Sequence, residues 1–326
     1  MRTVGELVEA WLAHASTRLE VATVMSYRTA VGQCLPHIGA VPLADVSPAV
    51  LDALYVRLLA DGRRASTVHR YHRALHAAFR QGVRWGWLAT NPADVASPPR
   101  VHRRRIRPPS AADVVRLIDT AAPDLAVALR VLVATGMRRG EVCGLRWRDV
   151  DLAESSIRIE TSVVHGETGL IEKDTKTHAA RRLSLDAGTV AVLRAHRHAR
   201  GRRAVGAGVV LRPDAFVLSD CVDGADPWRP NRLTHAFARL RATLGLDDVR
   251  LHDLRHFQAT ELIAAGVDVR TVAGRLGHAD PSVTLKVYAA FMQPADEAAA
   301  RVIEGLLRSG SPTDDRADHG ILETWQ

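Results

Sequence analysis

The sequence predicts a mainly α-helical protein with a small β-sheet, folded as two domains. Apolar residues recur at helical spacing through roughly the first 90 residues, whereas period-two alternation is confined to a region near residue 160. Between these parts, residues 91–109 are rich in Pro and Arg and have no apolar periodicity. A chain of 326 residues is long enough to bury a separate core on each side of such a stretch.

The N-terminal part, residues 1–95, is expected to form a compact bundle of about four helices. Apolar residues at helical spacing indicate the first two helices, in 4–11 and 24–35. Ser47, which a proline follows, is typical of a helix N-cap with Pro in the first turn. Ser66 indicates the start of the last helix of the bundle.

A basic linker and a mixed domain are expected next. We interpret residues 96–109 as the linker between the domains. The second domain, residues 110–308, begins with a helix that Ser110 caps. A buried apolar helix over 125–134 follows.

The β-structure is expected in the middle of this second domain. Residues 156–165 alternate apolar and polar side chains, which predicts one strand, and 170–171 and 182–185 are further strand pieces. The chain then becomes helical again, with a polar loop over 201–213. Residues 309–326 are acidic and polar, which predicts a loosely ordered tail.

The charge balance points to a polyanionic partner. There are 44 Lys and Arg residues against 36 Asp and Glu, a formal net charge of +8, and nucleic acid is the commonest partner of this kind. A GC-rich genome would explain the use of Arg in place of Lys, because the only lysines are Lys173, Lys176 and Lys286. It does not explain the surplus of basic over acidic residues.

The cysteines and the hydropathy restrict the compartment. Cys34, Cys143 and Cys221 show neither a disulfide framework nor zinc spacing, which suits a reducing cytoplasm. No apolar run approaches the roughly 20 residues that span a bilayer, so no membrane association is expected. The N-terminus is too polar for a secretion signal.

Several polar residues follow one another in an order that suits attack on a phosphodiester. Cleaving DNA without a metal needs a nucleophile, cations for the non-bridging oxygens, an acid for the leaving oxygen and a base. Arg138 and Arg255 suit the second task, because a guanidinium donates two bonds to a phosphate and never deprotonates. Tyr288, ten residues after His278, is the candidate nucleophile.

Lysine and histidine positions complete the candidate set. A lysine kept in an Arg-dominated chain indicates a group that must give up its proton, and we prefer Lys176 over Lys173 as that acid. His252 and His256 have the spacing of a zinc pair, but no glutamate of the metalloprotease pattern stands between them and no third ligand is evident. We therefore expect neither a metal nor a cofactor.

These motifs, in this order, resemble the tyrosine recombinase, or phage integrase, family. Thr135 to Glu141 match its Thr-Gly-x-Arg-x-x-Glu motif, and a Thr-Lys-Thr context surrounds Lys176. The His-x-x-Arg box is matched by His252 and Arg255, and the Leu-Gly-His box ends at His278. The resemblance covers roughly residues 3–308.

The resemblance implies a fold and a reaction. It implies a SAM-like helical core-binding domain, a mixed α/β tyrosine-recombinase catalytic domain, and site-specific recombination through a 3′-phosphotyrosyl intermediate. It also implies a homotetramer on two DNA sites, coupled by the C-terminal helix around Val302 to Leu307. The implied catalytic residues are Arg138, Lys176, His252, Arg255, His278 and Tyr288.

Other basic residues are candidates for binding the DNA backbone. They lie just before and on the last helix of the bundle, and in the linker: Arg63, Arg64, His69, Arg70, Arg73, Arg103, Arg104 and Arg105. An ordinary solvated helix surface would have the same composition. Two other functions remain open at this point: relaxation of DNA by a type IB topoisomerase-like enzyme, and non-catalytic DNA binding by a regulator.

Overall fold

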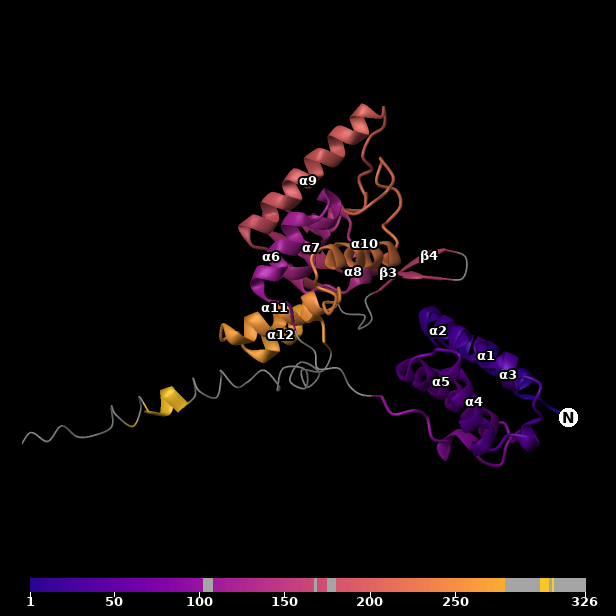
Figure 1. Cartoon of the computed structure of the whole chain (residues 1–326). Coiled ribbons are helices and arrows are strands. Elements are labelled where there is room, and N and C mark those ends of the chain that lie inside the picture. Colours follow the sequence, from indigo (N-terminus) through magenta and orange to yellow (C-terminus); the bar gives the residue numbers. More distant parts are fainter. Residues whose placement is uncertain (102–107, 167–168, 175–179, 279–299, 305–306, 308–326) are drawn as a thin grey trace, which may run out of the picture.

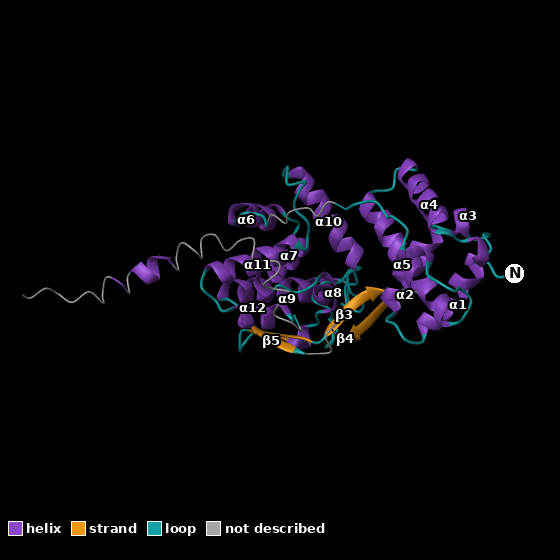
Figure 2. Cartoon of the chain, turned by 90° about the horizontal axis from the view of Figure 1, so that it is seen from below, coloured by secondary structure: helices purple, strands orange, loops and turns teal. Residues whose placement is uncertain are grey.

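The computed structural model of the chain describes residues 1–101, 108–166, 169–174, 180–278, 300–304 and 307 (Figure 1). Within these residues the fold is mainly helical, with strands confined to one part of the second domain (Figure 2). The predicted fold class is therefore confirmed. No helix of the described residues is both long enough and apolar enough to cross a lipid bilayer.

The N-terminal bundle is built from helices that their sequence starts explain. Thr3 and Glu6 form a reciprocal capping box at the first helix, and the Ser47 hydroxyl accepts from the amide of Val50, as predicted. Buried apolar side chains from the helices meet in one core, with Leu7 and Phe79 fully covered. The helices are α1 (Val4–Ser16), α2 (Val21–Gly32), α3 (Leu35–Ile38), α4 (Pro48–Ala60) and α5 (Ala65–Arg84).

Two details of the bundle differ from expectation. Helix α5 begins at Ala65, one residue before Ser66, and Arg64 takes the N-cap position without a side-chain cap. The Pro-rich stretch does not leave the bundle at residue 91, because Pro92–Asp94 form a 3-10 turn and Ala93 and Ala96 are buried in the bundle core. The spacing of apolar residues along the sequence does not reveal a contact that only two alanines make.

The second domain surrounds a larger core. Ser110 caps its first helix through a capping box with Asp113, as predicted. Its helices are α6 (Ala111–Thr120), α7 (Pro123–Thr135), α8 (Arg139–Gly144), α9 (Ala187–Gly206), α10 (Pro230–Thr243), α11 (Asp253–Ala264) and α12 (Val269–Leu276). Its strands are β1 (Val150–Asp151), β2 (Ser156–Ile159), β3 (Thr161–His165), β4 (Leu170–Asp174) and β5 (Arg181–Ser184).

The predicted single strand over 156–165 is wrong, because it is two strands in two sheets. Strand β2 lies between β1 and β5 in a three-stranded antiparallel sheet, whereas β3 pairs with β4 in a separate hairpin. Ile157 and Ile159 point into the core on one side of the break, and Val163 does so on the other. Alternation therefore continues across the break, and period-two spacing cannot show that the pairing partner changes.

The predicted loop over 201–213 begins too early, because α9 continues to Gly206. Arg200 is the reason. Its buried side chain donates to the backbone carbonyls of Ser219 and Cys221, which fixes the end of the helix against the following loop. A buried arginine of this kind is indistinguishable in sequence from the solvated ones around it.

Candidate active site

The site is assembled where the ends of α7 and α12 meet the start of α11. Gly136 ends α7 in the left-handed conformation, with φ of 65°, and its position leaves no room for a side chain. A Cβ there would lie 2.2 Å from Oε1 of Gln258 and 2.7 Å from a methyl group of Leu276. The Thr-Gly pair before Arg138 therefore forms a turn and also lies where α7, α11 and α12 come into close contact.

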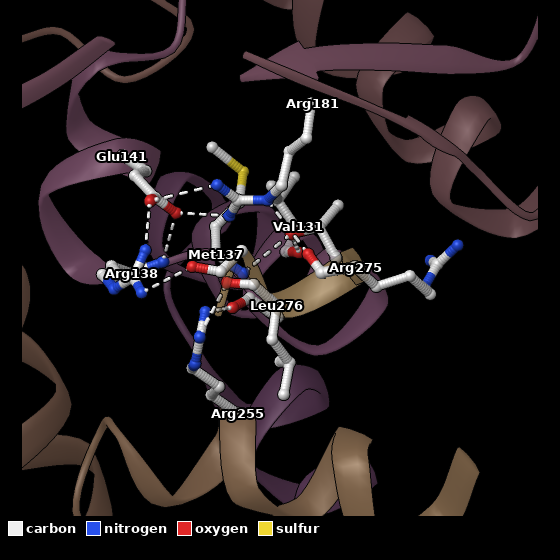
Figure 3. Close-up of polar contacts among 11 residues, drawn as sticks. Val131, Met137, Arg138, Glu141, Arg181, Arg255, Arg275 and Leu276 are labelled. Atoms are coloured by element: carbon white, nitrogen blue, oxygen red, sulfur yellow. Dashed lines mark hydrogen bonds and ion pairs between the residues drawn. The ribbon is translucent and has the colours of Figure 1, made fainter. Parts of the chain in front are cut away.

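Arg255 is buried, with 3% of its surface exposed, and it ties these helix ends together. Its Nη1 donates to the carbonyl of Gly136, and its Nη2 donates to the carbonyl of Leu276 at 2.7 Å. The last carbonyls of a helix lack partners within the helix and carry partial negative charge, so a guanidinium there is stabilised. Figure 3 shows Arg255 beside Leu276.

Arg138 sits at the start of α8 and reaches the same region. Its Nη2 donates to the carbonyl of Gly277 at 3.0 Å, and its Nη1 donates to Oε1 of Glu141 at 2.9 Å. The Arg138 side chain is 29% exposed, whereas that of Glu141 is 1% exposed. A carboxylate and a carbonyl thus hold the guanidinium on its protein-facing side, and its outer part faces solvent.

Glu141 has a second cationic partner that sequence analysis did not single out. Nη1 and Nη2 of Arg181 donate to its two oxygens at 3.2 and 2.7 Å (Figure 3). Burial alone would raise the pKa of Glu141, but the bonds and charges of Arg181 and Arg138 outweigh burial and hold that pKa below its usual range. The carboxylate is therefore charged at neutral pH. The sequence alone shows neither the burial of Glu141 nor which residue supplies its second cation.

The two candidate histidines lie beside the arginines. His252 is the N-cap residue of α11 and His278 follows Gly277, which ends α12 in the left-handed conformation. Burial, together with the charges of Arg255 and Arg138, lowers the pKa of His278 to about 4. Desolvation by the surrounding protein, together with the charges of His256 and the same two arginines, lowers the pKa of His252 to about 4, although part of the residue is exposed to solvent. Both imidazoles are neutral at pH 7 and able to accept a proton.

The structure therefore brings Arg138, His252, Arg255 and His278 to one place. Lys176, Tyr288, Arg103, Arg104 and Arg105 lie outside the described residues. Lys173, the alternative to Lys176, lies in β4 and pairs with Glu20, the N-cap residue of α2, at 2.6 Å. Within the described part of the chain, no cluster of His, Cys, Asp and Glu could hold a metal ion.

A cleft between the two domains opens onto these residues. Its walls include Met25 and Arg70 from the bundle and Arg138, Lys173 and His252 from the second domain. A neighbouring hollow is lined by Arg64 together with His252 and Arg255. Basic side chains from both domains thus face a shared space.

The remaining bundle candidates have mixed surroundings. Arg70 and Arg73 are exposed on α5, and Arg63 is exposed although its Nη2 donates to Gln33 at 2.8 Å. His69 is half-buried, and its Nδ1 is buried without a hydrogen-bond partner among the described residues.

Comparison with known proteins identifies the family. The profile described as the phage integrase family matches residues 110–293, more than half of the chain. The chain belongs to the phage integrase family of tyrosine recombinases. The putative defective protein IntQ of Escherichia coli K12 is 26% identical over 340 residues, which cover 95% of this chain and 85% of that protein. An integrase of Saccharopolyspora erythraea is 25% identical, covering 86% of this chain and 77% of its own length.

Solved structures show that this integrase-family chain shares its fold with DNA-bound relatives. The Tn1549 transposon integrase in complex with transposon right end DNA matches with a TM-score of 0.76 at 19% identity, covering 93% of this chain and 100% of that one. A lambda integrase tetramer bound to a Holliday junction matches with a TM-score of 0.64 at 18% identity, covering 88% and 77%. Both matches extend over the helical bundle as well as the family's matched region.

Proposed function

We propose that this phage integrase family member cleaves and rejoins DNA at specific sites through a 3′-phosphotyrosyl intermediate. The observation that supports this most is the convergence of two guanidinium groups and two neutral imidazoles at the ends of α7 and α12. A tetrahedral phosphate between them would find cations for its charged oxygens and proton acceptors in one place.

Arg138 and Arg255 are proposed to bind the non-bridging oxygens of the scissile phosphate. The bonds described above anchor both guanidinium groups, and the outer part of the partly exposed Arg138 still faces solvent. Anchoring by those bonds fixes each cation before DNA arrives, which avoids reorganisation at the moment of reaction. His278 is proposed to hydrogen-bond the same phosphate.

Tyr288 and Lys176 are proposed as nucleophile and acid. The Tyr288 oxygen attacks phosphorus, the bond from phosphorus to the 5′-oxygen breaks, and Lys176 gives that oxygen a proton. The phenol proton passes toward neutral His252. The phosphodiester energy is kept in the protein–DNA ester, so a 5′-hydroxyl of a partner strand can reverse the step without an external cofactor.

The cleft between the domains supports double-stranded DNA as the substrate. Arg70 from α5 faces it opposite Arg138 and His252, and Arg64, the N-cap residue of α5, lines the neighbouring hollow with His252 and Arg255. We assign residues 1–95 as the core-binding domain, 96–109 as the linker and 110–308 as the catalytic domain, with 309–326 as a polar tail. A reducing cytoplasm, where DNA is available, is the proposed compartment.

A homotetramer on two DNA sites is proposed as the active assembly. Val302, Ile303 and Leu307 are 62%, 55% and 70% exposed, which is more apolar surface than a helix turn normally leaves uncovered. We propose that this segment docks on a neighbouring subunit. Truncation after residue 293 should then abolish strand exchange and leave DNA binding by the monomer, whereas intact recombination would contradict the assignment.

A nicked suicide substrate tests the central proposal. DNA from sites that the protein footprints in its own genomic neighbourhood is nicked near the cleavage position, so that the released strand diffuses away. The wild type should form a covalent adduct on a denaturing gel, and Tyr288→Phe should not. Adduct with Tyr288→Phe would exclude this nucleophile, and no adduct with the wild type would favour a DNA-binding regulator. The comparisons do not favour either alternative function, and a plasmid relaxation assay separates the topoisomerase-like one.

A further inference from the structure

Arg181, the first residue of β5, has an unusual environment for an arginine of this chain. Its side chain is 9% exposed and makes three bonds to groups from two different helices. Two of these bonds go to the oxygens of Glu141 on α8, and the third runs from Nε to the carbonyl of Arg275 on α12 at 3.0 Å (Figure 3). Its neighbour Arg182 is exposed and donates to the hydroxyl of Ser156 instead.

The groups that Arg181 holds are one step away from the phosphate-binding arginines. Glu141 accepts from Arg138, so Arg181 fixes the carboxylate that fixes Arg138. The next two carbonyls after Arg275, those of Leu276 and Gly277, accept from Arg255 and Arg138. One guanidinium therefore braces the supports of both cations.

The Arg181 guanidinium packs closely against Gly277. A Cβ on Gly277 would lie 2.9 Å from its Nη1, so the glycine of the Leu-Gly-His box makes room for this side chain. The glycine is also left-handed, with φ of 67°. Both features place the guanidinium against the turn that carries His278.

Arg181 also changes the net charge of the cluster that it forms with Glu141 and Arg138. Glu141 is buried, and Arg138 alone would form a neutral pair with it, which would weaken the attraction of Arg138 for a phosphate. With Arg181 also bound, two cations share one carboxylate, and the cluster keeps a net charge of +1. A bidentate arginine is suited to this, because it satisfies both carboxylate oxygens in one plane.

We propose that Arg181 is a positioning residue of the strand-cleavage reaction, which acts through Glu141 and the α12 turn to hold Arg138 in place and to leave the cluster with a net positive charge. It does not touch DNA itself. The inference rests on the proposed function for its effect on rate, but not for its effect on Arg138.

The test compares Arg181→Gln, Arg181→Lys and the matched control Arg182→Gln in the full chain. On the nicked substrate, Arg181→Gln should slow single-turnover adduct formation by roughly 10- to 100-fold, the range expected when a support outside the reacting groups is displaced. Arg181→Lys should restore part of the rate, because an ammonium can meet one carboxylate oxygen. Arg182→Gln should match the wild type. DNA affinity at subsaturating protein should change much less than the rate.

A double variant decides whether the effect passes through Glu141. If it does, Glu141→Gln/Arg181→Gln should form the adduct no more slowly than Arg181→Gln, because the double variant has no buried carboxylate left to offset the charge of Arg138. If the rate loss of the double variant were instead the product of the losses in Arg181→Gln and in Glu141→Gln, the two residues would act independently. The proposed action of Arg181 through Glu141 would then be wrong. Arg181→Lys carries the comparison if Arg181→Gln does not fold.

A measurement without catalysis separates this inference from the proposed function. Arg138 contributes to the lowered pKa of His278, so displacement of Arg138 in Arg181→Gln should raise that pKa toward its ordinary value, as followed by NMR titration of labelled histidine. If the wild type forms no adduct but this shift occurs, the proposed function fails and the positioning role stands. An unchanged His278 titration with wild-type adduct rates would overturn the role of Arg181.

Discussion

At the scale of single residues, the candidate site depends on contacts that its motifs do not spell out. Sequence analysis selected Arg138, Arg255, His252 and His278 from residue type and order, and the structure brings these four together. It did not select Arg181, because one buried arginine among 41 cannot be recognised without knowing what it faces. The chain has 44 basic residues, of which only three are lysines. Residues that are proposed to face the substrate are thus easier to recognise in the sequence than residues that only hold them in position.

Gly136 gives a direct test of those supports. Gly136→Ala should destabilise the protein by more than the roughly 1–2 kcal/mol cost of a left-handed non-glycine residue, because its Cβ meets Gln258 and Leu276. Gly62→Ala is the matched control, since Gly62 has φ of 81° and nothing within 4 Å of a Cβ. Urea unfolding of both variants measures the difference. Equal losses would mean that packing at Gly136 adds nothing to the backbone cost.

The neutral histidines predict a pH dependence of stability. Their pKa values are near 4 in the folded protein and ordinarily near 6.5, so the unfolded chain binds more protons between these limits. The free energy of unfolding should therefore fall as pH drops from about 6.5 toward 4, and it should not depend on these groups above pH 7. His278→Gln should flatten the slope in thermal melts from pH 7.5 to 5. An unchanged slope in that variant would contradict the assignment.

At the scale of elements, sequence reasoning succeeded where a cap or a buried face marks a helix. Ser47 and Ser110 cap the helices they were expected to cap, and the apolar helix before Thr135 is α7. It failed where an element is defined by its partner. Strands β2 and β3 are continuous in pattern but belong to different sheets, and the end of α9 depends on the buried Arg200. Pairing between strands is a long-range property, and period-two spacing does not contain it.

Helix α5 carries the element-scale prediction for DNA binding. Arg70→Ala should weaken binding to duplex DNA and reduce the slope of log affinity against log salt by about one, as expected for the loss of one phosphate contact. Arg70 is exposed and faces the cleft between the domains. Arg57→Ala, on exposed α4 surface, is the matched control. Fluorescence anisotropy from about 50 to 200 mM salt measures both slopes, and equal slopes would remove this face of α5 from the interface.

At the scale of the whole molecule, two large and separate apolar cores explain the two-domain organisation, beside a small third cluster of Ala259, Val272 and Leu276. One buries side chains between Val4 and Ala96, and the other buries side chains between Val114 and Phe257. The one ion pair described above between the domains, from Lys173 to Glu20, is largely solvent-exposed on the glutamate side, and such pairs contribute about 1 kcal/mol or less. Each domain therefore has its own source of stability, and a change in the position of one domain relative to the other does not have to disturb either core.

The bundle should consequently fold without the second domain. A fragment of residues 1–101 contains all of its core and is expected to unfold cooperatively, with helical circular dichroism in the native state. A shorter fragment, residues 1–88, is the control. It lacks buried Ala93 and Ala96, the bond from Asn91 to the carbonyl of His76 at 3.2 Å, and the bond from the Ser97 amide to Asp52 at 2.7 Å.

That loss should lower the free energy of unfolding by roughly 2–4 kcal/mol, because each hydrogen bond contributes about 1 kcal/mol and the apolar contacts add to it. Thermal melts of the two fragments give the comparison. If residues 1–88 were as stable as residues 1–101, the stretch after residue 88 would belong to the linker rather than to the bundle. If neither fragment folded, the bundle would depend on the second domain for its stability, and the independence of the two cores would be refuted.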